Sequence, residues 1–308
     1  MTIPLDVMPA VRATDDMSLI HIGVARRFLW SLRRELWENR WLYLAPASAA
    51  LVFLIGFAVS AAGLPEQMRT IASLAVIRQR AAIVAPYDLV EALLMAAGLL
   101  ISAVYCLDAL YGERRDRSVL LWKSLPVSDL VTVLAKASIP IVIQPLITFV
   151  VIVVTQLLMQ VLSTAVLAAT GHGAAPIWTQ FSFLSNAGAL LSHLLAVHGL
   201  ATAPFFGWLL MISAWAPRAP FIWAFVPPLV IGFVEKMAFN TTRFFQLLVS
   251  RLAGGPDTVQ IPGNTLMEPM TQTTLANFLA TGGFWIGLVI TAAFLAVAVR
   301  LRRAGRPL

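Results

Sequence analysis

The run that decides the fold is Ala137–Pro217, ASIPIVIQPLITFVVIVVTQLLMQVLSTAVLAATGHGAAPIWTQFSFLSNAGALLSHLLAVHGLATAPFFGWLLMISAWAP, which has no Asp, Glu, Lys or Arg in 81 residues. A helix that crosses about 30 Å of hydrocarbon needs only ~20 apolar residues. The turn-rich stretch 170–176, TGHGAAP, interrupts the run. The run therefore predicts two membrane spans, at about 138–169 and 182–214.

Four further apolar runs flank this stretch, at about 42–62, 87–111, 219–240 and 274–299. The chain has 59% apolar and only 12% charged residues, whereas a soluble domain carries roughly 45–50% and about 25%. This composition excludes an ordinary soluble enzyme. We expect an all-α polytopic membrane protein in which 1–308 form a single transmembrane domain of six helices. No cleavable leader is visible, so the first run is expected to be an uncleaved span.

Positively charged residues predict the orientation of the spans, because Lys and Arg near span ends resist translocation. With the N-terminus inside, 16 of the 22 Lys and Arg fall on the cytoplasmic side. The segments on the other side, including an outer loop at 241–273, hold the remaining 6. Both termini are therefore predicted to be cytoplasmic, which agrees with an even number of spans.

The segment before the first span, 18–41, has the pattern of an amphipathic helix. Phe28, Leu32 and Leu36 fall on one helical face, arginines fall on the other, and Trp37 is placed as an interface anchor. This pattern predicts a helix in the plane of the lipid headgroups that bends into the first span. The alternative is a basic tail that only fixes topology.

The segment 112–137 is predicted to be a cytoplasmic loop, and 111–136 read YGERRDRSVLLWKSLPVSDLVTVLAK. The pattern predicts a short charged helix, a proline turn, and a second helix capped by Ser128 or Asp129. A connecting loop has no need of exposed Trp122, Leu125 and Pro126. An apolar patch rimmed by charge indicates a docking surface for another protein.

This loop resembles the cytosolic loop of six-span permease subunits of bacterial ATP-binding-cassette (ABC) exporters. The resemblance rests on the run Glu-Arg-Arg-x-x-Ser, followed by Leu-Pro-Val-Ser-Asp and a lysine, and covers about 25 residues as a motif. The commoner pattern has Gly-Thr where this chain has Arg117-Ser118. The resemblance implies an elbow helix at 18–41 and a coupling loop whose residues lie at or beside the ATPase, namely Glu113, Arg114, Arg117, Trp122, Ser124, Leu125, Pro126, Ser128 and Lys136.

A nucleotide-binding P-loop is missing from the sequence, because none of the three lysines follows a glycine. We therefore expect no enzyme activity and no cofactor in this chain, with ATP and Mg bound by a separate P-loop ATPase subunit. The family implies a permease homodimer in a bacterial cytoplasmic (inner) membrane, in contact with lipid. The basic residues indicate topology, not nucleic-acid binding.

Ionisable groups within spans are functional candidates by default. Glu235, His193 and His198 are the candidates for a translocation path. The two histidines are five residues apart, about 140° apart on an α-helix, so we expect them to hydrogen-bond between helices and not to share a metal. Glu91 is expected to snorkel or to form an interface ion pair. No metal site is predicted, although Met267, Met270 and His172 could handle copper on the outer side.

Three function classes remain open. The first is an exporter permease that moves a hydrophobic or amphipathic cargo, with the stripe Gly98, Ser102 and Cys106 on the second span packing against the partner permease. The second is a membrane scaffold or signalling subunit without a transport path. The third is an intramembrane enzyme, which would need paired acids or a His–acid pair at mid-membrane.

Overall fold

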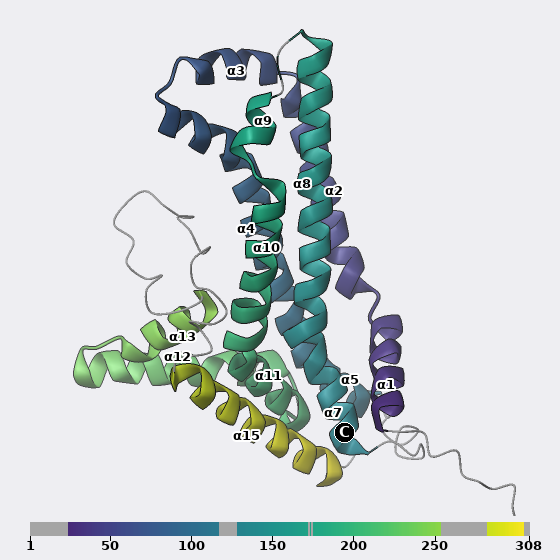
Figure 1. The fold of residues 1–308 in the computed structure, drawn as a ribbon. Coiled ribbons are helices and arrows are strands. Elements are labelled where there is room, and N and C mark those ends of the chain that lie inside the picture. The colour runs from purple at the N-terminus through teal and green to yellow at the C-terminus, as the bar shows by residue number, and fades with distance from the viewer. Residues whose placement is uncertain (1–23, 117–127, 172, 174, 254–281, 305–308) are drawn as a thin grey trace, which may run out of the picture.

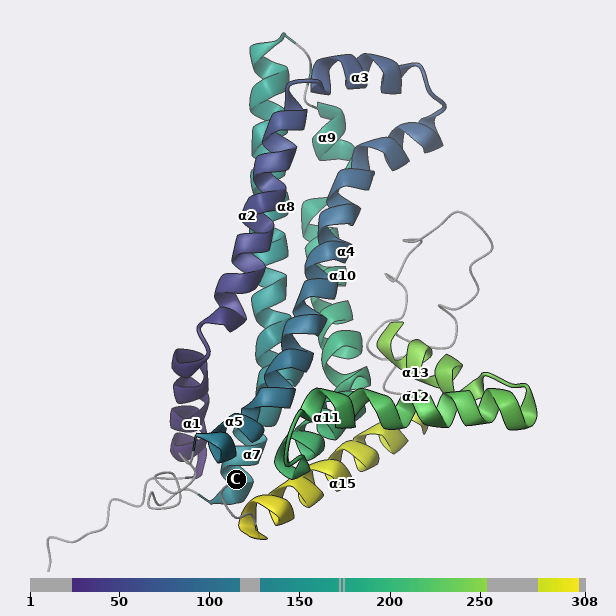
Figure 2. The same ribbon diagram turned by 180° about the vertical axis from the view of Figure 1, so that it is seen from behind.

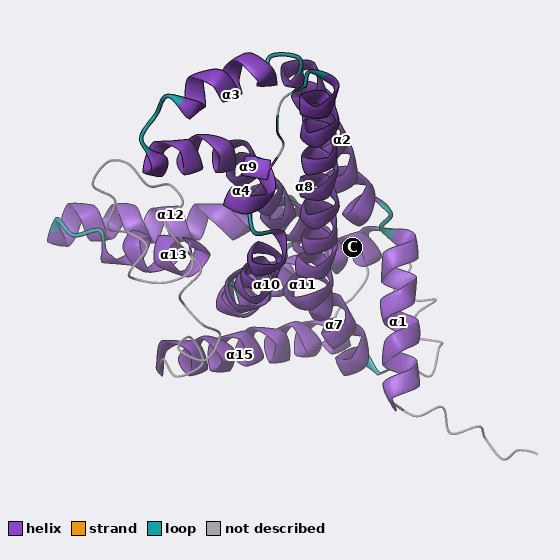
Figure 3. Ribbon diagram, turned by 45° about the horizontal axis from the view of Figure 1, so that its top comes forward, coloured by secondary structure: helices purple, strands orange, loops and turns teal. Residues whose placement is uncertain are grey.

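The computed structural model describes residues 24–116, 128–171, 173, 175–253 and 282–304, and all regular elements in these residues are helices (Figure 3). In chain order they are α1 (Val24–Glu38), α2 (Trp41–Ala61), α3 (Leu64–Ala72), α4 (Val76–Ala109), α5 (Tyr111–Arg115), α7 (Asp129–Ser138), η1 (Ile139–Ile143), α8 (Gln144–Ala169), α9 (Ala175–Gln180), α10 (Phe183–His193), η2 (Leu194–Ala201), α11 (Ala203–Trp215), α12 (Pro220–Phe239), α13 (Arg243–Ala253) and α15 (Gly282–Ala304).

Six helical stretches among the described residues are long and apolar enough to cross a membrane, by length and composition. This confirms the predicted all-helical class for the described residues and the predicted number of helices able to span a membrane. Helices satisfy their backbone hydrogen bonds internally, which hydrocarbon requires. The six stretches are Trp41–Ala61, Val76–Arg115, Asp129–Ala169, Ala175–Ala201, Pro220–Phe239 and Gly282–Ala304.

The helices form two groups. The long helices α2, α4 and α8 run side by side with α10, and α3 crosses one end of this group (Figures 1 and 2). At the other end α11, α12 and α15 run at a steep angle to α8, with α1, α5 and α7 beside them. The apolar core follows this division. Of the two largest buried clusters, one, including Leu42 and Phe206, lies near α1 and α11, and the other, including Ile152 and Leu167, lies farther along α8.

The predicted fourth span differs from the structure. The segment expected as one helix at about 182–214 is broken at Thr202, and α11 begins at Ala203. Pro204 explains the break, because its ring clashes with the carbonyl four residues earlier and it lacks an amide hydrogen. The predicted interruption is present where the chain is described: α8 ends at Ala169, Gly171 has a left-handed conformation (φ 75°), and α9 begins at Ala175.

Two π-helical segments lie next to each other inside the bundle. The first, η1, joins α7 to α8, and the second, η2, continues α10. They approach closely at Gly199, where any side chain would collide with the carbonyl oxygen of Ile141. Segments of this kind interrupt the regular α-helical hydrogen bonding and are frequent at functional sites.

Candidate functional site

Charged side chains from four helices meet in a buried cluster at the end of the bundle where α1, α5, α7 and α15 come together (Figure 1). Lys136 is its centre. The Lys136 Nζ lies 2.8 Å from Glu35 Oε1 and 3.1 Å from Glu113 Oε1, and all three side chains are less than 10% exposed. Glu113 opens the predicted coupling loop and Lys136 ends it, so this contact closes the loop at its base.

Two arginines extend this ion cluster to the first and last helices. Arg34 Nη2 lies 2.9 Å from Glu35 Oε1 and 3.3 Å from Glu113 Oε1. Arg302, on α15, pairs with Glu113 and places its Nε 3.0 Å from Asp129 Oδ1 at the start of α7. Helices distant in the sequence are thus tied to the two ends of one loop.

The ion cluster has three bases (Arg34, Lys136, Arg302) and four acids (Glu35, Glu113, Asp129, and Glu38 at its exposed edge, 3.4 Å from Arg34). Tyr105 adds an uncharged donor, its hydroxyl donating to Glu35 Oε2 at 2.8 Å. Burying such charges costs several kcal/mol per ion unless each finds partners. Removing Lys136 therefore leaves two buried carboxylates, those of Glu35 and Glu113, with fewer compensating positive charges.

The carboxyl groups of Glu35 and Glu38, both on α1, have pKa values shifted in opposite directions. Burial raises the pKa of Glu35, but the charges of Lys136 and Arg34 outweigh it, so this pKa lies below its ordinary value. Glu38, at the edge of the ion cluster, has its pKa raised, first by partial burial. Glu35 is therefore held ionised, which keeps its bridge to Lys136 intact in mildly acidic solution.

Arg114 makes a second attachment of the loop. Its Nη2 donates to the backbone oxygens of Ser213 (2.9 Å) and Ala216 (2.7 Å) at the C-terminal end of α11. The Ser213 hydroxyl accepts the amides of Leu110 and Tyr111 at the joint between α4 and α5. A cation at the end of a helix satisfies carbonyls that have no partner within the helix.

The predicted coupling residues fall into three groups. Glu113 and Lys136 lie in the ion cluster, and Arg114 binds the end of α11. Ser128 caps α7, its side chain accepting the amide of Val131 at 3.3 Å. The remaining residues lie outside the described part of the chain, namely Arg117, Trp122, Ser124, Leu125 and Pro126.

Sequence reasoning missed four charged members of the ion cluster, namely Arg34, Glu35, Asp129 and Arg302, as sharing one site. Glu35 carried a signal, because it is an acid between the apolar positions Leu32 and Leu36. An acid on the apolar face of a helix indicates a buried partner. Arg302 carried no such signal, because it is one of several basic residues in the last segment and no spacing relates it to Glu113.

The amphipathic helix α1 is present, but its faces are used differently from the prediction. Leu32 and Leu36 pack against the protein core, and Phe28 is half-buried. Trp30 and Trp37 point outward, 68% and 63% exposed. The reason is Glu35, whose ion pairs turn the 32–36 face toward α7. The placement of α1 at a membrane surface remains a prediction.

The candidate path residues are not brought together. Glu235 joins α12 to α13, its Oε1 accepting the Thr241 hydroxyl at 2.6 Å and the Arg243 amide at 2.8 Å. A carboxylate there stabilises the start of α13, which is a structural role. Far from it along the chain, the His193 and His198 rings meet edge to face with centroids 5.3 Å apart.

The prediction that the two histidines face apart is wrong. It assumed an α-helix, but His198 lies in the π-helical η2 and His193 immediately precedes it. A π-helix repeats hydrogen bonds from i to i+5, so residues five apart fall on one face. No group of three or more His, Cys, Asp or Glu that could hold a metal occurs among the described residues. Met267, Met270 and His172 lie outside them.

Glu91 is also placed differently from the prediction. It forms no ion pair with the described residues; instead, the amides of Gln156 (3.0 Å) and Asn186 (3.2 Å) donate to its Oε2. The stripe expected at a subunit interface is buried within the chain, since Gly98 packs directly on Thr148 of α8. Small residues on α4 thus bring two helices of the same subunit together.

A cavity of about 430 Å³ lies between α11, α12 and α15. Its lining is apolar and rich in tryptophan, and it is called the apolar cavity below. Trp215 and Trp223 form part of its wall, with their rings in an edge-to-face contact at 5.0 Å. The volume falls in the range of small-molecule sites, roughly 300–1,000 Å³. The cavity suits an apolar or aromatic group.

The fold and these sites were compared with known proteins. No family model matches the chain, and no curated protein and no solved structure is significantly similar to it.

Proposed function

We propose that this chain is the membrane-spanning permease subunit of an ATP-driven ABC exporter, with ATP hydrolysed by a separate subunit docked on the 112–137 loop. The observation that carries the proposal is the ion cluster. Glu113 and Lys136, at the two ends of the loop, pair with each other at 3.1 Å. A loop closed in this way moves as a unit when a docked protein pushes on it.

Three contacts that join the loop to other helices support the proposal that movement of the loop is passed into the membrane. Arg34 connects the loop to α1, Arg302 connects it to α15, and Arg114 connects it to α11. These links involve charge-assisted hydrogen bonds, which are stronger and more directional than neutral ones. Movement of the loop is therefore passed to the helix that leads into the first span, to the last span itself, and to the helix that precedes α12.

The nature of the cargo is proposed from the apolar cavity. Its wall of tryptophan and aliphatic side chains offers no charge to an ionic cargo. Apolar contacts favour hydrophobic or amphipathic molecules. In this proposal the cargo moves out of a bacterial cytoplasm through a homodimer of permeases in contact with lipid.

The docking claim is tested by isolating the tagged chain from membranes in mild detergent. We expect an equimolar subunit with a P-loop and ATPase activity. The variant Leu125→Glu should lose that subunit, because a charge disrupts the apolar patch. The control is Ile77→Glu, at an 86% exposed position at the start of α4 and outside the predicted spans. A chain that is isolated without any ATPase under these conditions would favour a scaffold over an exporter.

A further inference from the structure

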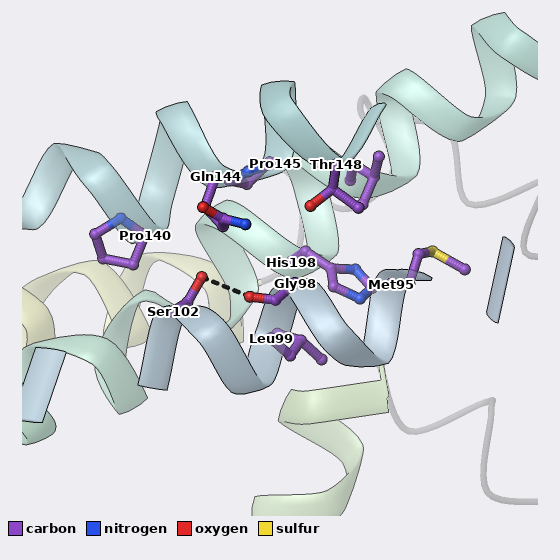
Figure 4. Close-up of a pocket in the computed structure, with 10 residues that line it drawn as sticks. Met95, Gly98, Leu99, Ser102, Pro140, Gln144, Pro145, Thr148 and His198 are labelled. Atoms are coloured by element: carbon purple, nitrogen blue, oxygen red, sulfur yellow. Dashed lines mark hydrogen bonds between the residues drawn. The ribbon is translucent and has the colours of Figure 1, made fainter. Parts of the chain in front are cut away.

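A small cavity lies between the two π-helical segments, apart from the ion cluster and from the apolar cavity. It measures about 10 Å³. Its lining comes from α4, η1, the start of α8, and η2 (Figure 4). Unlike the apolar cavity, it carries polar side chains, namely Ser102, Gln144, Thr148 and His198.

Two of these side chains lack hydrogen-bond partners. Gln144 is only 1% exposed, yet neither its Oε1 nor its Nε2 has a partner in the part of the chain that the structure describes. The Nδ1 atom of His198 is likewise buried and unpartnered there. Both side chains line the same cavity (Figure 4).

Such unmet hydrogen bonds restrict what can occupy the cavity. A buried amide that loses both its bonds carries a large desolvation penalty, so the occupant must both donate and accept. A bare cation cannot accept from Gln144 Nε2, and no carboxylate lines the cavity to balance it. Its volume is that of about one water-sized sphere.

We propose that this cavity is an internal hydration site, in which one water molecule bridges the Gln144 amide and the His198 imidazole. Gln144 directly follows η1 and His198 lies within η2. The water thereby ties together two segments whose backbones already touch at Gly199. Buried waters typically make about three hydrogen bonds to groups that otherwise have none. This inference does not rest on the proposed function.

X-ray hydroxyl-radical footprinting of the purified full chain tests the site, because radiolysis of a bound water oxidises the side chains next to it. Met95 also lines the cavity and is only 7% exposed. We expect Met95 and His198 to be oxidised at least tenfold faster than Met159, which is fully buried and outside the cavity. Equal, background rates at Met95 and Met159 would overturn the proposal.

Two matched variants connect this labelling to Gln144. Gln144→Met, close in shape and without polar atoms, should abolish the rapid oxidation of Met95. Gln160→Met is the control, because Gln160 is equally buried and unpartnered on the same helix but does not line the cavity. It should leave the oxidation of Met95 unchanged. Persistence of rapid labelling in Gln144→Met would contradict the assignment.

Thermal unfolding of Gln144→Met is a second test, because a hydrated cavity and a dry cavity predict opposite changes in its melting temperature. If the cavity holds water, Gln144→Met loses the bridge and its melting temperature stays the same or falls. If the cavity is dry, the substitution removes two unsatisfied groups, and the melting temperature rises by about 4 °C or more. A rise of that size would refute the hydration site even if labelling proved ambiguous.

Discussion

At the scale of single residues, Lys136 is the position on which the ion cluster depends most. The variant Lys136→Met removes the most buried cation of the ion cluster and leaves the buried Glu35 beside Arg34, which is 23% exposed. We expect a loss of about 3–5 kcal/mol in the free energy of unfolding. Glu35→Gln combined with Lys136→Met should cost less than the sum of the single changes. Arg69→Met is the control, since its pair with Glu66 is exposed at 3.4 Å and is worth about 0–1 kcal/mol. Additive losses, measured by denaturation in detergent, would contradict the coupling.

The lowered pKa of Glu35 predicts that the stability of the folded state depends on pH. The folded state binds this proton less readily than the unfolded state, so the ion pair contributes full stability above the ordinary carboxyl pKa of 4.5. This contribution is lost as the pH falls from there through the lowered pKa. We expect the variant Glu35→Gln to show a flatter stability profile below pH 5. Melting curves at stepped pH measure this, and parallel profiles would show that Glu35 does not contribute.

At the scale of elements, the cap of α7 holds the second end of the loop in place. The variant Ser128→Ala removes the bond to the Val131 amide, and we expect a cost of about 1 kcal/mol. Hydrogen exchange of the first turn of α7 should accelerate. Ser48→Ala is the control, because the hydroxyl of Ser48 bonds only to its own helix at Ala45. Equal exchange of α7 in both variants would show that the cap has no role.

A comparison of the helices with the predictions shows which features the sequence was able to predict. Hydrophobic length predicted the six spans, and turn chemistry predicted the break after Ala169 and the cap of α7. Helical periodicity failed at His193 and His198, because the π-helix changes the repeat. Only part of the ion cluster was foreseen, since pairs such as Glu113–Arg302 join positions 189 residues apart and leave no local pattern.

At the scale of the whole molecule, the predicted orientation has a direct test. The chain has one cysteine, the buried Cys106, so a Cys106→Ala background permits single-cysteine labelling. The variant Gln67→Cys, on α3, should react with an impermeant reagent in intact cells. Arg115→Cys, at the opposite end of the bundle, should react only in inverted vesicles. The reverse pattern would place both termini outside.

The central claim is that ATP hydrolysis in a partner reaches the spans through Glu113. The most direct measurement is cargo-stimulated ATP turnover of the complex reconstituted with the variant Glu113→Gln, with Asp116→Asn as the control, since Asp116 pairs only with the exposed Arg115 in the described structure. We predict that Glu113→Gln retains its partner and its basal turnover but loses most cargo stimulation, while Asp116→Asn behaves as the wild type. Full cargo stimulation in Glu113→Gln, at equal subunit content, would contradict the account.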